Sequence, residues 1–204
     1  MTAKTPKFWN WMAERYAKSP IADEASYQAK LAKTLEHVDQ ESRVGELGCG
    51  TGSTAIFIAP HVREIVAADF AENMIAIARR KAEAAGLTNA NFRVGSMEVL
   101  DGEFDAFLCH SILHLVHNPQ DIIAEVAAKL KSGGVLISST ACVADMGVGM
   151  KILLPFLRWP WLGLTPYSRT KEEMREMYRK AGLEIVHDWQ PNKKAALFLI
   201  GRKT

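Results

Sequence analysis

The chain has 204 residues, 24% of them charged, and a formal net charge of +2, which suits one domain with a sizeable core and disfavours nucleic acid as a partner. Its three cysteines have no CxxC spacing, so no disulfide framework or zinc site is indicated, and we expect a cytoplasmic protein with reduced thiols. No apolar run reaches the roughly 20 residues that span a bilayer or resembles a signal peptide, so we expect neither membrane spanning nor secretion.

Apolar side chains at helical spacing predict two amphipathic helices within residues 1–40, separated near Ser19 and Pro20. This segment is rich in aromatic side chains and precedes the first predicted strand, so it could form a helical cover over a ligand. Packing in the core is the alternative for most of these rings. Trp9 and Tyr16 are candidate residues of a substrate pocket.

Strands and helices alternate within residues 43–140, which predicts a doubly wound α/β fold with a mostly parallel sheet and helices on both faces. The predicted elements are strands 43–47, 65–69, 91–94, 104–109 and 135–140, a helix ending at 59, and helices 72–85 and 120–130. We interpret Gly86, and the pair Gly133 and Gly134, as stops at the C-terminal ends of the last two helices.

An apolar insertion at residues 142–168 interrupts this alternation and is too long for a minimal connection. Phe156 and Trp159 within it are further candidates for the substrate pocket. Three interpretations stay open: a wall for an apolar substrate, a peripheral membrane contact, or a dimer interface. The oligomeric state is accordingly left between a monomer and a homodimer.

Residues 170–204 are expected to close the fold with a helix at 171–181, a stop at Gly182 and two strands at 183–189 and 195–201. Because only a short loop joins these strands, they must be antiparallel neighbours. The sheet is therefore predicted to have seven strands and an antiparallel last strand.

Gly48, Gly50 and Gly52 stand between the first predicted strand and the following helix. Glycines in a strand–turn–helix context suit a turn that lies against a nucleoside ligand. Ser53 occupies the position where the dinucleotide fingerprint G-x-G-x-x-G needs its third glycine, so NAD is disfavoured. Glu46, at the carboxyl end of the strand, would be buried at a cost unless a cation such as a ligand ammonium pairs with it.

Asp69 ends the second predicted strand, about twenty residues after the turn, where an acidic side chain can accept hydrogen bonds from both hydroxyls of a ribose. Capping of the next helix is the alternative for this residue. Phe70 and Met74 follow it and could pack on an adenine ring.

The segment from Glu46 to Gly52 resembles the signature of class I S-adenosylmethionine-dependent methyltransferases. Residues 69–74 resemble the ribose-binding strand end of that family, 104–107 its fourth strand and 130–136 the turn into its fifth. The resemblance covers about residues 43–140 and 170–203. It implies a Rossmann-like fold, S-adenosyl-L-methionine as methyl donor, S-adenosyl-L-homocysteine as product, and methyl transfer as the reaction.

By this resemblance, Glu46 would face the methionine ammonium and Asp69 would hold the ribose. The other implied cofactor contacts are Gly48, Cys49, Gly50, Gly52, Phe70, Met74, Ser96, Met97 and Cys109. The chain departs from the family at Ser96, where an acidic residue often accepts a hydrogen bond from the adenine amino group. Ser96 offers a weaker neutral acceptor, and Glu98 is the alternative.

Three histidines follow the fourth predicted strand, and His110 and His114 are the candidate catalytic residues because an imidazole can act as a general base near neutral pH. Packing or surface roles are the alternative, above all for His117. Methyl transfer depends mainly on alignment and does not require such a base. We expect no metal, because no neighbouring carboxylate or cysteine completes a ligand set.

These observations lead to one hypothesis, that the chain is a single-domain methyltransferase acting on a small, fairly apolar acceptor, quinone-like or lipid-like. Its parts would be the helical cover at 1–40, the cofactor-binding core at 43–140, the insertion at 142–168 and the closing segment at 170–204. The alternatives are a non-catalytic module that binds S-adenosylmethionine or S-adenosylhomocysteine, and an NAD-dependent oxidoreductase.

Overall fold

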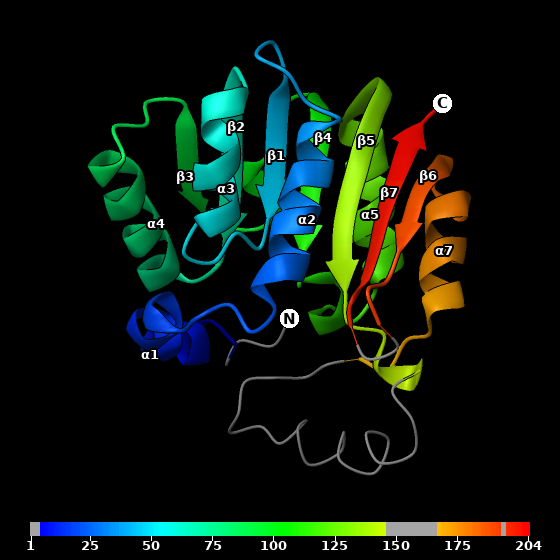
Figure 1. Cartoon of the computed structure of the whole chain (residues 1–204), viewed down its shortest axis with the longest axis horizontal. Coiled ribbons are helices and arrows are strands. Elements are labelled where there is room, and N and C mark those ends of the chain that lie inside the picture. Colours follow the sequence, from blue (N-terminus) through cyan, green and yellow to red (C-terminus); the bar gives the residue numbers. More distant parts are fainter. Residues whose placement is uncertain (1–4, 146–166, 193–194) are drawn as a thin grey trace. The chain divides into compact units, whose positions relative to one another are not determined.

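A computed structural model describes residues 5–145, 167–192 and 195–204 of the chain (Figure 1). Two compact units make up the chain, one formed by residues 6–108 and one by residues 109–204 with the residues before Pro6. The predicted insertion, with Phe156 and Trp159, lies outside the described residues except at its two ends.

Seven strands are hydrogen-bonded in the order β3-β2-β1-β4-β5-β7-β6. Their bounds are β1 (Arg43–Leu47), β2 (Glu64–Asp69), β3 (Ala90–Val94), β4 (Phe104–His110), β5 (Leu130–Thr140), β6 (Leu183–Trp189) and β7 (Leu197–Lys203). Pairing is parallel between β1 and β2, β1 and β4, and β2 and β3, whereas β7 is antiparallel to both β5 and β6. The predicted seven-stranded sheet with an antiparallel last strand is confirmed.

The described α-helices are α1 (Thr5–Lys18), α2 (Glu24–Leu35), α3 (Ser53–Ile58), α4 (Glu72–Ala84), α5 (Pro119–Lys129) and α7 (Lys171–Lys180). Gly86 has φ 67° just beyond α4 and Gly182 has φ 75° just beyond α7, so both are helix stops as predicted. None of these helices is long and apolar enough to cross a membrane.

In the unit of residues 6–108, α1 packs on α4. Asn10 accepts a hydrogen bond from the Asn73 backbone N–H (2.8 Å), and its carbonyl accepts one from the Asn73 side chain (3.0 Å). Ala13, only 1% exposed, joins a buried apolar cluster that contains Met74 of α4, and Trp9 packs against the same cluster. Since α4 starts three residues after Asp69, α1 is held beside the carboxyl end of β2.

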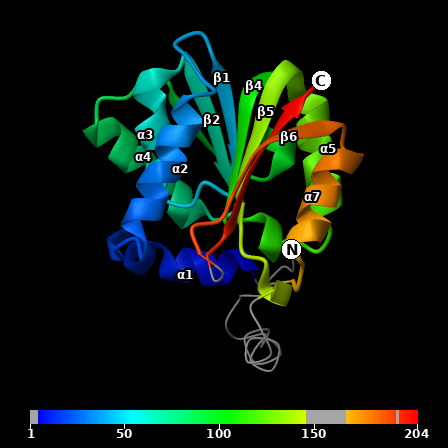
Figure 2. The ribbon, with the colours of Figure 1, turned by 45° about the vertical axis from the view of Figure 1, so that its right-hand side comes forward.

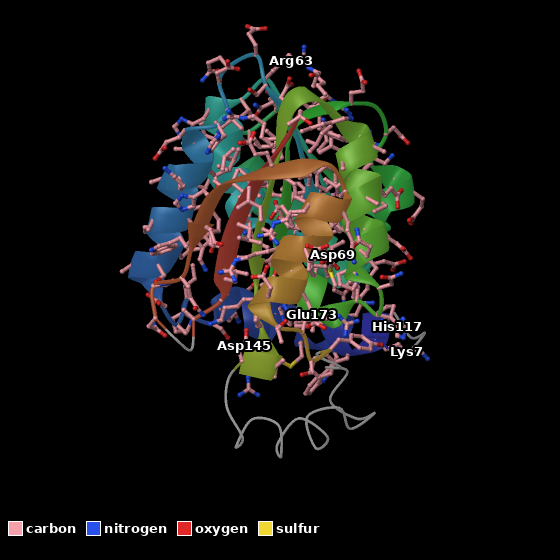
Figure 3. All side chains as sticks on the ribbon, turned by 90° about the vertical axis from the view of Figure 1, so that its right-hand side faces the viewer. Lys7, Arg63, Asp69, His117, Asp145 and Glu173 are labelled. Carbon is pink, nitrogen blue, oxygen red and sulfur yellow. The ribbon has the colours of Figure 1, made fainter. Side chains whose placement is uncertain are left out.

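In the unit of residues 109–204, α5 and α7 lie on one face of β5, β7 and β6 (Figure 2). Tyr178 of α7 is fully buried, and its hydroxyl donates to Ser138 of β5 (2.7 Å). A capping box between Thr170 and Glu173 opens α7, and the Lys171 N–H also donates to Asp145 (2.8 Å). Figure 3 shows Asp145 and Glu173 at the same end of this helix.

Two differences from the predicted boundaries change the local conformation. Gly133 and Gly134 do not stop a helix, because α5 ends at Lys129 and the backbone is already extended at Leu130, where β5 begins. The last strand was predicted to start at residue 195 but starts at Leu197. Ala195 instead belongs to a turn, in which its N–H donates to the backbone and side-chain oxygens of Asn192 (3.1 and 3.0 Å).

Candidate functional site

The turn between β1 and α3 has the backbone that its glycines predict. Gly48, Gly50 and Gly52 have φ angles of 73°, 53° and 75°, in the left-handed region that favours glycine. The N–H groups of Gly48 and Cys49 both donate to the carbonyl of Ala68 in β2 (2.8 and 3.0 Å). The turn is therefore fixed to the carboxyl end of the neighbouring strand.

The glycines of this turn have different surroundings. A Cβ atom at Gly52 would lie 2.7 Å from Phe92 and 2.8 Å from Ala78, so this glycine permits close packing on β3 and α4. Among the described residues, a Cβ atom at Gly50 would meet only the Tyr16 ring, at 3.8 Å. The absence of a side chain at Gly50 thus leaves space in which a ligand can approach the backbone of the turn. At Gly52 the missing side chain instead allows α4 and β3 to pack closely on the turn.

We therefore expect different outcomes from alanine at these two positions. Gly52→Ala should lower the free energy of unfolding by about 2–4 kcal/mol, since it combines overpacking with a strained φ. Gly50→Ala should cost only about 1–2 kcal/mol from its φ, and should weaken ligand binding in the folded protein. Urea unfolding and calorimetric titration measure the two effects; equal losses of stability would contradict the distinction.

Glu46 is buried in β1, and the residue is only 2% exposed. The Ala55 N–H donates to this carboxyl group, but Oε2 has no hydrogen-bond partner among the described residues. Burial, reinforced by the nearby charge of Asp69, raises the pKa of Glu46 to about 8. An ionised carboxylate at this position needs a cation, and no described cationic side chain supplies one.

Asp69 ends β2 and ties the turn to the start of α4. Its Oδ2 accepts from the Gly50 N–H (3.0 Å) and its Oδ1 from the Ala71 N–H (2.9 Å). Burial raises the pKa of Asp69, and these two hydrogen bonds oppose that shift. Each carboxylate oxygen keeps a lone pair for another donor such as a ribose hydroxyl.

Two tyrosines from the helical segment lie near these carboxylates. Tyr16 is 49% exposed, but desolvation of its hydroxyl, followed by the charges of Asp69 and Glu46, raises its pKa, which places the hydroxyl within electrostatic reach of both. The Tyr27 hydroxyl lies 3.3 Å from Thr54 Oγ1, and its pKa is likewise raised, chiefly by burial. Sequence reasoning named Tyr16 but missed Tyr27, for which the aromatic richness of the segment was the only signal.

The other predicted cofactor contacts have varied environments. Met74 is 2% exposed and lies in the cluster beneath α1, with Phe70 packed against it. Met97 is 4% exposed. The Ser96 N–H donates to the Glu98 carboxylate (2.7 Å). The two residues considered as acceptors for the adenine amino group are therefore in direct contact. The remaining two, Cys49 and Cys109, are buried thiols.

His110, the last residue of β4, and the two histidines that follow this strand belong to the other unit and have separate environments. The His110 ring stacks on Phe198 with centroids 6.3 Å apart, and His117 meets Tyr167 edge to face at 5.3 Å. His114 has a solvent-inaccessible Nδ1 with no hydrogen-bond partner among the described residues. Burial lowers the pKa of His114 to about 4, below the neutral range in which an imidazole serves as a general base.

Ser111 has a strained backbone at the end of β4. Its φ of 55° is the only positive value among the described residues other than glycine. Its N–H donates to the Ser139 carbonyl of β5 (2.8 Å), which holds this conformation. Strain of this kind collects at functional sites in proteins. Among residues that the structure describes, no three of His, Cys, Asp and Glu gather as a metal site would require.

Residues 44–134 match a family model described as a methyltransferase domain. Over 137 residues the chain is 32% identical to the uncharacterized methyltransferase YcgJ of Bacillus subtilis, a match that covers 66% of this chain and 53% of the relative. Residues 44–134 belong to the class I S-adenosylmethionine-dependent methyltransferases. This confirms the family that the sequence resembles.

Another relative of this methyltransferase is the ubiquinone biosynthesis O-methyltransferase of Roseobacter denitrificans, 31% identical over 151 residues. That match covers 71% of this chain and 60% of the relative, so the chain spans between half and two thirds of these curated proteins. Solved structures share the fold. YcgJ aligns with a TM-score of 0.70 at 20% identity, over 86% of this chain and 98% of the other. Magnesium protoporphyrin IX methyltransferase of Synechocystis, with bound S-adenosylhomocysteine, gives 0.72 at 18% identity, over 97% and 94%.

The residues present in the methyltransferase fit the cofactor of its family, S-adenosyl-L-methionine. The unpaired oxygen of Glu46 is an acceptor for the ammonium group, and Asp69 has lone pairs for the ribose hydroxyls. Gly50 leaves the turn open on the side of Tyr16. Dinucleotide binding would need a third glycine at Ser53.

Proposed function

We propose that this methyltransferase transfers a methyl group from S-adenosyl-L-methionine to a small, fairly apolar acceptor of quinone-like or lipid-like chemistry. The observation that carries the donor assignment is the buried, unpaired carboxylate oxygen of Glu46 beside a glycine turn. A buried carboxylate without a cation is unfavourable, and the donor's ammonium removes that cost on binding.

The relatives named as ubiquinone biosynthesis O-methyltransferases support an acceptor of this class, at 31–32% identity over 114 to 151 residues.

Bound S-adenosylmethionine would supply a methyl group on a positively charged sulfur. In that displacement, a bond from the acceptor atom to the methyl carbon would replace the sulfur–carbon bond, whose electron pair would remain on sulfur. The residues of this chain act mainly by position: Glu46 and Asp69 hold the two polar ends of the donor, and Tyr16 stands over the turn. Alignment of this kind supplies most of the rate enhancement that displacement at carbon needs.

Asp69→Ala is expected to weaken binding of S-adenosylhomocysteine at least about tenfold, because a charge-assisted hydrogen bond is worth about 1.5–3 kcal/mol. Isothermal titration calorimetry measures this affinity. Asp101→Ala is a matched control, since Asp101 is an exposed residue of the same unit whose carboxylate pairs with Arg93 (3.1 Å). An unchanged affinity in Asp69→Ala would remove the ribose assignment.

Incubation of the protein with methyl-labelled donor and a cell extract, followed by identification of the labelled product, tests the transfer itself. A small apolar labelled product supports the proposal. Donor binding without a labelled product from any extract would indicate a non-catalytic binding module instead. Binding of NAD in preference to the donor would indicate an oxidoreductase.

A further inference from the structure

Three buried polar side-chain atoms have no hydrogen-bond partner among the described residues: Glu46 Oε2, His114 Nδ1 and Thr140 Oγ1. Glu46 stands near the carboxyl end of β1, His114 follows β4, and Thr140 is the last residue of β5. Ligands of open α/β sheets bind outside the carboxyl ends of the strands. The donor accounts for Glu46 and leaves the other two atoms, both in the unit of residues 109–204, unexplained.

Thr140 is buried, with 1% of its surface exposed. Side chains alternate along a strand, so Thr140 lies on the same face of β5 as Ser138. The Ser138 hydroxyl is paired with Tyr178 (2.7 Å), but the Thr140 hydroxyl has no partner. A buried hydroxyl without a partner is unfavourable, so one that persists calls for an explanation.

His114 is held close to the same strand end. It lies in a short 3-10 helix, Leu113–Leu115, and its carbonyl accepts from the Tyr167 N–H (2.8 Å). Three residues earlier, the strained Ser111 donates its N–H to Ser139, the neighbour of Thr140 (2.8 Å). The backbone of this loop is therefore fixed to the carboxyl end of β5, where the unpaired Thr140 hydroxyl is.

Three side chains of this loop, Ile112, Leu113 and Val116, are apolar and buried. In such surroundings the imidazole of His114 is neutral, with one ring nitrogen that donates and one that accepts. A charged ligand group would be costly to desolvate here, whereas a neutral group that both donates and accepts would not.

We propose that His114 Nδ1 and Thr140 Oγ1 form a polar subsite that binds a neutral hydroxyl group of the methyl acceptor. A hydroxyl donates one hydrogen bond and accepts others, so it pairs with Nδ1 in either tautomer and with the threonine hydroxyl. The assignment of this subsite to the acceptor rests on the proposed function. His114 acts in it as a recognition and positioning group.

The first test uses stability, because removal of an unpaired buried polar atom and removal of a paired one have opposite effects. Thr140→Val and His114→Leu should each raise the melting temperature of the unliganded protein, by about 2–4 °C. Ser138→Ala, in the same strand, removes a paired hydroxyl and should lower it. A lowered melting temperature in both Thr140→Val and His114→Leu would show that these atoms are paired, and would overturn the proposal.

The second test uses 2-naphthol and naphthalene as probes that differ by one hydroxyl, titrated into protein saturated with S-adenosylhomocysteine. Wild-type protein should bind 2-naphthol more tightly, and Thr140→Val and His114→Leu should each reduce this preference about fivefold or more. His114→Asn, which keeps a polar atom near the Nδ1 position, should retain part of it. Ser138→Ala should retain all of it.

Equal affinity of wild-type protein for the two probes, or an unchanged preference in both variants, would overturn the subsite. Failure of the proposed function gives a different pattern. In that case no extract component becomes labelled, while the hydroxyl preference and its loss in the variants persist, and the subsite would belong to a bound molecule that is not methylated.

Discussion

Glu46→Gln is expected to weaken binding of S-adenosylhomocysteine at least about a hundredfold while making the unliganded protein more stable. Removal of one member of a buried charge pair costs about 3–5 kcal/mol, and the amide leaves the donor's ammonium without its counter-charge. In the unliganded protein the amide avoids the cost of ionising a buried carboxyl group whose Oε2 has no partner among the described residues. Calorimetry and thermal unfolding measure these two effects on the same variant.

The gain in stability should depend on pH in a defined direction. Burial raises the pKa of Glu46 from 4.5 to about 8, so between these pH values the folded chain binds a proton that the unfolded chain lacks. Stability from this group is complete below pH 4.5 and is lost as the pH rises to about 8, by about 5 kcal/mol in total. The difference between Glu46→Gln and wild type should grow by that amount over the same range.

Urea unfolding at several pH values from 4.5 to 9 checks this difference. The other groups that face Glu46, namely Asp69, Cys49, Tyr16 and Tyr27, are present in both proteins, so their own titrations contribute nearly equally. A difference that does not vary with pH would show that Glu46 is ionised or solvated throughout. Weaker binding without any gain in stability would point instead to a disturbed turn.

The fold could be predicted because each local pattern agrees with the global one. Apolar runs that alternate with amphipathic helices predict the parallel part of the sheet, and the short connection after Trp189 predicts its antiparallel edge. The predicted helix stop at Gly133 was wrong. A glycine after a helical pattern is typical of a C-terminal stop, but the backbone is already extended at Leu130. Only tertiary pairing decides between these two local conformations.

The donor side of the site could be predicted better than the acceptor side. Glu46 and Asp69 lie at strand ends beside a turn of three glycines, and this pattern can be recognised in the amino-acid sequence. His114 and Thr140 are candidates because a buried polar atom of each has no hydrogen-bond partner among the described residues. This property depends on how a loop packs against a strand end. In the sequence, Thr140 is an ordinary β-branched residue of a strand. The low pKa of His114 likewise comes from its burial, which composition does not show.

Binding of S-adenosylhomocysteine, which carries the same ammonium as the donor, is expected to release about one proton at pH 6.5. Glu46 holds a proton at that pH in the unliganded protein, since its pKa is raised to about 8. A bound ammonium stabilises the carboxylate and lowers this pKa, so the proton leaves to the buffer. By linkage, the apparent affinity should fall up to about tenfold for each pH unit below 8.

Calorimetric titrations at pH 6.5 in two buffers of different ionisation enthalpy measure the released proton directly. Its number should fall as the pH is raised above 8, where the carboxylate is already ionised in the free protein. Glu46→Gln is the matched control, because it keeps the shape of the side chain and has no proton to release. Asp69 remains in this control, and burial raises its pKa too, so proton release that persists in Glu46→Gln would assign the coupled group to Asp69 instead.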